Sequence, residues 1–153
     1  MPSPFVENVL PREVKERSGE QKGRALLVGI SSSWGRQVRE LAHGGIHVEF
    51  VAHHLKPQDV AARAQRDAAV VIVDLACSPG KGIETVLACR HTSKRSPVIV
   101  IADKLSAELA RAISRIDIVR LAFHPVTSSQ LRNALHEAFR IGRNERKQAD
   151  DHQ

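Results

Sequence analysis

The chain has 153 residues, which suits one domain with a sizeable core, and 42% of them are hydrophobic. Aromatic residues make up only 3%, so we expect an aliphatic core. The formal charge of +6 comes from cations interspersed with acids, which argues against a nucleic-acid partner. Two cysteines are too few for a disulfide framework or a metal set, and no signal peptide or membrane span is visible. We therefore expect a cytoplasmic protein without a membrane partner.

The beginning of the chain is polar, and an alternation of strands and helices starts after it. Residues 1–23 contain three prolines and many charged side chains, so we expect a flexible N-terminal arm there. Residues 24–30 (RALLVGI) predict a strand. Residues 31–45 predict a helix that serines can cap and that two glycines end. A strand over 46–52 and a short helix over 56–67, with a proline near its start, follow.

The middle of the chain contains the most apolar segments. Residues 68–74 (AAVVIVD) and 96–102 (SPVIVIA) are almost continuously apolar, which indicates strands covered on both faces. Residues 83–90 between them predict a helix. Residues 106–116 predict another helix, because leucine and isoleucine recur on one side.

The end of the chain adds one more strand and one more helix. Residues 117–123 predict the fifth strand, and residues 127–141 predict a long helix with apolar residues at a spacing of four. Residues 142–153 (GRNERKQADDHQ) are polar and charged, and we expect a flexible C-terminal tail there. The predicted domain therefore covers residues 24–141.

The alternating pattern predicts an α/β fold. Parallel strands joined by right-handed helical crossovers give a flavodoxin-like (βα)5 three-layer sandwich with a five-stranded parallel sheet. In such sheets, ligands and chemistry gather at the carboxyl ends of the strands. Asp74 ends the third strand at that edge, which makes it the first candidate for a functional residue.

Several residues at this edge resemble the receiver domain of bacterial response regulators. They are Asp74 at the end of the third strand, Gly82 eight residues later, and His124 followed by Pro125 after the fifth strand. The resemblance covers about residues 24–141. It implies that the aspartate at the position of Asp74 accepts a phosphoryl group from a histidine kinase. It also implies that two acids after the first strand help to hold Mg²⁺, which neutralises the transferring group.

The remaining residues of the site depart from the receiver pattern. The positions of the two acids correspond to Gly29 and Ile30, and the hydroxyl residue that ends the fourth strand corresponds to Ala102. The lysine after the fifth strand corresponds to His124, and the aromatic switch residue corresponds to Leu121. Each of these changes removes or alters a group that handles charge or couples phosphorylation to the rest of the domain. The resemblance therefore implies a degenerate phosphorylation site.

The function that we expect is that of a stand-alone degenerate receiver, a protein-interaction module in two-component signalling without Mg²⁺-dependent phosphotransfer. Its expected partner is a histidine kinase or a downstream effector, and it can form a homodimer through residues 106–116, 117–123 and 127–141. We expect no enzymatic activity, no catalytic residue, no metal site and no cofactor. In the alternative, Asp74 is phosphorylated by a histidine kinase, and Mg²⁺ is then required.

Of the other residues that stand out, His124 and Trp34 have two interpretations each, and the rest have one. His124 is either a cation beside Asp74, which would favour imidazolium, or a solvated histidine at the sheet edge. Trp34 either packs over the neighbouring loop or contacts a partner. His53 and His54 point to opposite faces if they lie in a strand, so they are not expected to chelate a metal together. We expect Cys77 and Cys89 to be reduced and structural.

A more distant alternative is a nucleotide- or nucleic-acid-binding α/β domain. Gly29, Ser31–Ser33 and Gly35 resemble the glycine- and serine-rich turn of short-chain dehydrogenases, which binds a dinucleotide at a helix N-terminus. The middle glycine of that turn is missing, and Trp34 would crowd a pyrophosphate. The chain also contains no tyrosine, so the catalytic residue of that family is absent.

Overall fold

The computed structural model describes residues 23–29, 34–51, 55–76, 78–92 and 95–151, with side chains as far as Glu145. The predicted N-terminal arm lies outside these residues, except for Gly23. Seven residues singled out above also lie outside them: Ile30, Ser31–Ser33, His53, His54 and Cys77.

The described residues form one five-stranded sheet in which all neighbouring strands are parallel. Its strands are β2 (Gly23–Val28), β3 (Ile46–Phe50), β4 (Val70–Asp74), β5 (Val98–Ala102) and β6 (Arg120–Phe123). The order β3-β2-β4-β5-β6 places β4 in the centre, with β3 and β6 at the edges. Every residue of β4 and β5 is buried, as their apolar sequences predict. The predicted doubly wound parallel sheet is thus confirmed.

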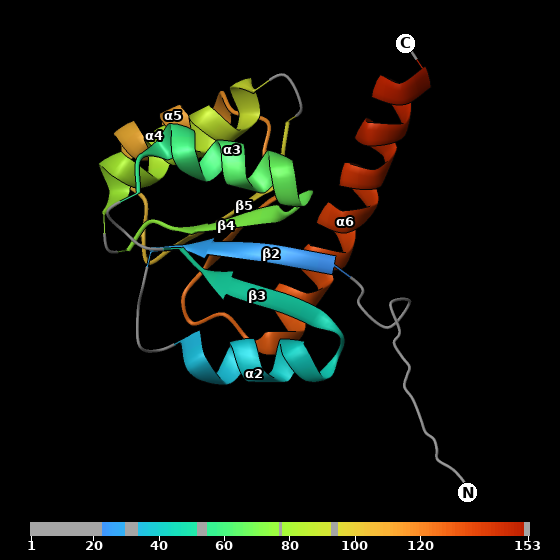
Figure 1. Cartoon of the computed structure of the whole chain (residues 1–153). Helices are drawn as coiled ribbons and strands as arrows, with labels where there is room; N and C mark the ends of the chain where they lie inside the picture. The colour runs from blue at the N-terminus through green and yellow to red at the C-terminus, as the bar shows by residue number, and fades with distance from the viewer. Residues whose placement is uncertain (1–22, 30–33, 52–54, 77, 93–94, 152–153) are drawn as a thin grey trace, which may run out of the picture.

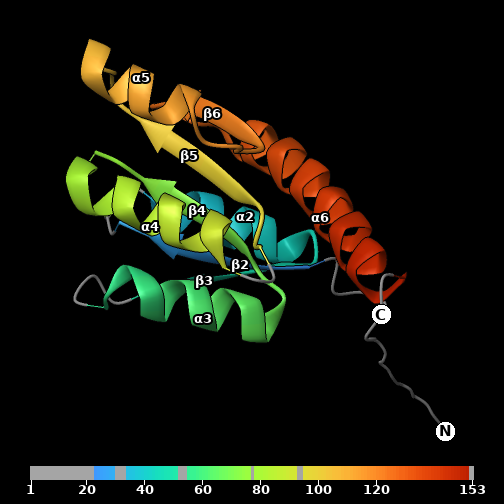
Figure 2. The same cartoon turned by 90° about the horizontal axis from the view of Figure 1, so that it is seen from above.

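Helices cover both faces of the sheet (Figures 1 and 2). They are α2 (Gly35–His43), α3 (Pro57–Asp67), α4 (Pro79–His91), α5 (Ala107–Ser114) and α6 (Ser128–Asp151). The helices α2 and α6 lie on one face, and α3, α4 and α5 lie on the other. The two resulting cores are aliphatic, as predicted. One contains Leu27, Ile72 and Leu135, and the other contains Leu26 and Val71.

Short-range hydrogen bonds fix where the last two helices begin. The Ser106 hydroxyl accepts a hydrogen bond from the Leu109 N–H at 3.1 Å and so caps α5. Before α6, the Thr127 N–H donates to Gln130 Oε1 at 3.0 Å, and the Gln130 N–H donates to Thr127 Oγ1 at 3.1 Å. This reciprocal pair satisfies N–H groups at the beginning of the helix.

The prediction of a tail from residue 142 was wrong as to secondary structure, because α6 continues to Asp151. Gly142 is buried and does not end the helix. Three residues later, Glu145 forms an ion pair with Arg90 at 3.5 Å. Arg90 is itself buried, and its guanidinium also donates to the Ser96 carbonyl oxygen at 2.9 Å and to Asp117 at 3.1 Å. The ion pair between Glu145 and Arg90 attaches this part of α6 to the rest of the domain. Its charged residues are also good helix formers. Although α6 is long, no helix within the described residues is apolar enough to cross a membrane.

Candidate functional site

The carboxyl ends of β2, β4 and β5 and the residue after β6 meet around Asp74. Backbone hydrogen bonds hold this edge together: the Leu75 N–H donates to the Ile101 carbonyl at 2.8 Å, and the His124 N–H donates to the Ala102 carbonyl at 2.9 Å. Asp74 is the last residue of β4, and its side chain has no exposed surface. Although Asp74 lies at the edge of the sheet, its carboxylate is covered by other side chains.

Trp34 is one of the side chains that lie on this carboxylate. It is the N-cap residue of α2 and is only 1% exposed. Its indole Nε1–H donates a hydrogen bond to Asp74 Oδ2 at 2.9 Å. Because β2 and β4 are neighbours in the sheet, Trp34, which comes six residues after the end of β2, can reach the end of β4. Trp34 is thus packed within the site, which excludes the alternative of an exposed partner contact.

His124 lies on the same carboxylate oxygen. Its Nε2 is 3.0 Å from Asp74 Oδ2, and its side chain is 22% exposed. The rings of His124 and Trp34 meet edge to face, with centroids 5.6 Å apart. Since an ionised carboxylate can only accept hydrogen bonds, Nε2 carries a hydrogen when Asp74 is ionised. This geometry agrees with the interpretation that places His124 beside Asp74. The following residue, Pro125, is joined to His124 by a cis peptide bond.

The other oxygen of Asp74 is also occupied. The Ala76 N–H donates to Oδ1 at 3.0 Å. The buried carboxylate therefore accepts from an indole, an imidazole and a backbone amide. Hydrogen bonds to a charged group contribute about 1.5–3 kcal/mol each, whereas a buried acceptor without partners is strongly destabilising. This arrangement satisfies Asp74 with protein groups alone.

Gly29 leaves no room for a side chain at the first of the two positions where the resemblance implies an acid. Its φ is +96°, a region that residues with a Cβ rarely adopt. A Cβ built on it would lie 2.5 Å from the Asp74 carbonyl oxygen and 3.2 Å from the Asp74 Cβ. Within the described part of the chain, no group of three or more His, Cys, Asp or Glu residues could hold a metal ion. The described residues therefore do not form the acidic magnesium site of an active receiver.

Two further site residues that the resemblance implies lie in β5 and β6. Ala102 ends β5 and is buried, so its methyl group supplies no hydroxyl. Leu121 lies in β6 and packs against the core on the α3–α5 side of the sheet. Away from the site, Cys89 is a free, buried thiol. Burial raises its pKa to about 12 and outweighs the lowering effect of the neighbouring Arg90, which fits the expected structural role.

Sequence reasoning missed the hydrogen bond between Trp34 and Asp74. The pattern contained a usable sign, because the one tryptophan of the chain follows the strand that neighbours β4. Strand order was needed to interpret it. Once β2 is placed beside β4, an indole at the start of α2 can reach the carboxylate.

Comparison with known proteins finds no matching family model and no matching curated protein. Solved structures do match. A signal receiver domain of a modulated diguanylate cyclase from Desulfovibrio desulfuricans has a TM-score of 0.64 at 19% identity, over 80% of this chain and 98% of its own. A signal receiver domain of a putative Luxo repressor protein from Vibrio parahaemolyticus has a TM-score of 0.65 at 17% identity, over 80% and 94%. The chemotaxis protein CheY4 of Vibrio cholerae has a TM-score of 0.61 at 24% identity, over 76% and 98%. At these identities the likeness shows the fold alone.

Proposed function

We propose that this chain, which has the fold of response regulator receiver domains, is a degenerate receiver that acts in two-component signalling through protein contacts. Its partner is a histidine kinase or a downstream effector, and it works without Mg²⁺-dependent phosphotransfer. The observation that carries this proposal is the environment of Asp74. Its side chain is unexposed and accepts hydrogen bonds through both oxygens.

Phosphotransfer to this carboxylate meets two obstacles. An attacking oxygen must approach the phosphorus of the donor directly, but the indole of Trp34 covers Asp74 and donates to Oδ2. The incoming group also carries about −1.5 to −2 charges, which Mg²⁺ would have to neutralise beside a second negative charge. Gly29 stands where a first acidic ligand is expected and has no space for one. His124 is the one cationic candidate that contacts Asp74 among the described residues.

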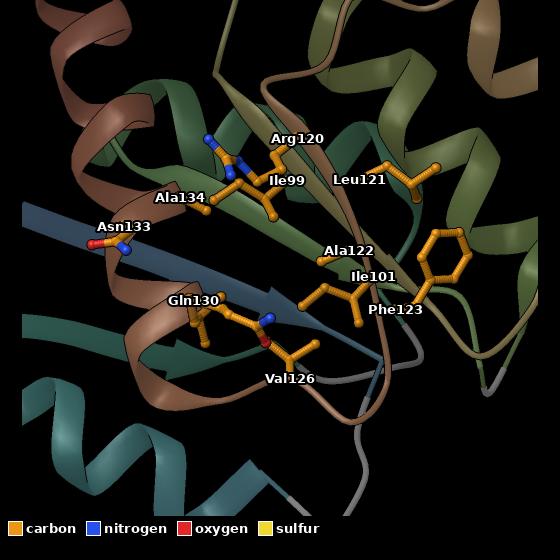
Figure 3. A pocket seen from close by; sticks show the side chains of 11 residues that line it. Ile99, Ile101, Arg120, Leu121, Ala122, Phe123, Val126, Gln130, Asn133 and Ala134 are labelled. Carbon is orange, nitrogen blue, oxygen red and sulfur yellow. The ribbon is translucent and has the colours of Figure 1, made fainter.

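The surface formed by α5, β6 and α6 supports a role in protein contacts. Strand β6 is an edge of the sheet, and Phe123 on it is 48% exposed. Beside β6, a pocket of about 390 Å³ opens against the first turns of α6 (Figure 3). Figure 3 shows Ile101, Ala122 and Val126 gathered between the strands and α6, while Phe123 points away from them. A pocket lined by both apolar and polar side chains, next to an exposed aromatic residue, is suited to binding a partner or a second copy of the chain.

The test is exposure of the protein to a small phosphodonor or to beryllofluoride with millimolar Mg²⁺, followed by intact mass and amide NMR spectra. We expect no added phosphate and no saturable shift for the wild type or for Asp74→Asn. Trp34→Phe serves as the matched variant, because it removes the indole N–H while keeping an aromatic ring. Since the Mg²⁺ ligands remain absent, we expect Trp34→Phe to stay unphosphorylated as well.

A phosphorylatable receiver treated in parallel confirms that the donor is active. A saturable, Mg²⁺-dependent change in the wild type that Asp74→Asn abolishes would contradict the proposal. It would establish the alternative, in which Asp74 accepts phosphate.

A further inference from the structure

Arginines that are interspersed with acidic residues along the sequence gather along α2 and α6 in the folded domain. The helices α2 and α6 pack side by side on one face of the sheet (Figure 1). The Gln37 side chain bonds to the Val126 carbonyl at 3.2 Å, and Glu40 bonds to Ser128 at the beginning of α6. The first turns of α6 and the helix α2 therefore share one surface, which the rest of α6 extends away from α2 (Figure 1).

Three arginines form a row along α6. Arg132, Arg140 and Arg143 are eight and three residues apart, so they share one side of the helix over about 16 Å. Arg132 begins the row beside the end of α2, where its Nε would be 3.9 Å from a Cβ on Gly44. Arg140 and Arg143 are exposed, and none of the three forms an ion pair within the described residues. Two further exposed arginines, Arg36 and Arg39, extend the charge onto α2.

The two acids on α6 whose side chains are described have partners outside the row. Glu137 lies three residues before Arg140 and forms an ion pair at 2.7 Å with Arg120 of β6. Glu145 is paired with the buried Arg90. Glu40 bonds to Ser128, about 6 Å along the helix axis from Arg132 and about 18 Å from Arg140. The two described acids of α6 therefore pair with arginines outside the row, and Glu40 is the acid that lies near its beginning.

We infer that the arginine row on α6, together with Arg36 and Arg39, binds the phosphate backbone of a nucleic-acid duplex. Guanidinium groups bind phosphate oxygens through paired hydrogen bonds, and a row of them matches an extended polyanion. The exposed large apolar residues of the described chain are Phe50 and Phe123, and both lie outside α2 and α6. A surface without an aromatic or apolar centre lacks the usual hot spot of a protein interface. It also lacks the stacking platform of a single-strand binder.

Binding of this kind has a defined signature. It is weak and independent of sequence, with Kd of about 10⁻⁴ to 10⁻⁶ M at physiological salt. Each phosphate that an arginine neutralises contributes about −0.9 to the slope of log K against log salt concentration. Three contacts from α6 therefore predict a slope of about −3, and contacts from α2 would make it steeper.

The experiment titrates a fluorescent 20-base-pair mixed-sequence DNA duplex with the full chain at several salt concentrations. The double variant Arg140→Gln/Arg143→Gln should flatten the salt slope by about 2 and weaken binding at low salt at least tenfold. The matched control is Arg111→Gln/Arg115→Gln, which removes the same charge from exposed residues at α5 on the other face of the sheet. The control should bind as the wild type does. Thermal unfolding confirms that both variants are folded.

Three outcomes would overturn the inference. One is absence of duplex binding at 50 mM salt. Another is an equal loss in both double variants, because net charge alone would then explain the binding. The third is poly-glutamate displacing the duplex as effectively as unlabelled DNA at equal charge, since the row would then be a site for an acidic protein.

Discussion

At the scale of single residues, the environment of Asp74 decides what the domain can do chemically. The carboxylate has hydrogen-bond partners on both oxygens, from Trp34, His124 and the Ala76 backbone. The same hydrogen bonds would have to be broken before either oxygen could attack a phosphoryl group. Retention of an aspartate at this position is thus compatible with a structural role in which it joins α2 and the segment after β6 to the centre of the sheet.

Gly29 gives the sharpest test at this scale. We expect Gly29→Ala to lower the free energy of unfolding by about 1–3 kcal/mol, because a Cβ there meets the Asp74 carbonyl oxygen and the backbone has a positive φ. Urea unfolding measured by circular dichroism gives this value. Gly80→Ala is the control, since a Cβ on Gly80 has nothing within 4 Å and should leave stability within about 0.5 kcal/mol. Equal effects of the two substitutions would show that Gly29 is not sterically restricted.

The contrast between Gly29 and Trp34 shows how far the residues of this site could be predicted. The loss of acidic ligands is visible in the sequence, because an apolar or missing side chain cannot bind Mg²⁺ wherever the backbone places it. The hydrogen bond from Trp34 is a contact between residues 34 and 74, which only the strand order brings together. Burial of Asp74 was missed for the same reason.

At the scale of elements, prediction was best where one physical effect dominates. The apolar runs of β4 and β5 could only be buried strands, and the structure places them at the centre of the sheet. The end of α6 was predicted wrongly because its charged composition is also that of a disordered tail. What distinguishes the two is the ion pair between Glu145 and the buried Arg90, a tertiary contact that composition does not encode.

This contact predicts a local effect on α6. We expect Glu145→Ala to increase amide hydrogen exchange beyond Gly142 by about 1.4- to fivefold, which corresponds to a partly exposed ion pair worth about 0.2–1 kcal/mol. Hydrogen exchange read out by mass spectrometry measures it peptide by peptide. The neighbouring Asn144→Ala is the control, because Asn144 is exposed and outside the ion pair. If both variants exchange at the same rate, the ion pair does not hold this part of the helix.

At the scale of the whole molecule, the two edges of the sheet provide a natural comparison. Each edge strand exposes one phenylalanine near its carboxyl end: Phe50 on β3 is 41% exposed, and Phe123 on β6 is 48% exposed. Of the two, Phe123 lies on the strand that also borders the pocket against α6. If the surface formed by α5, β6 and α6 carries the protein contacts of this domain, the two phenylalanines should differ in function although they are alike in exposure.

We therefore expect Phe123→Ser to weaken self-association, measured by sedimentation equilibrium, at least tenfold, a loss of about 1.4 kcal/mol. The physical reason is that an exposed aromatic side chain beside a partly apolar pocket contributes to binding mainly when a partner covers both. Phe50→Ser should leave association unchanged, and both variants should remain as stable as the wild type because neither ring belongs to the core. A chain that is monomeric at millimolar concentration would contradict self-association through this surface. A loss caused by Phe50→Ser alone would instead move the contact to the β3 edge, on the other side of the site around Asp74.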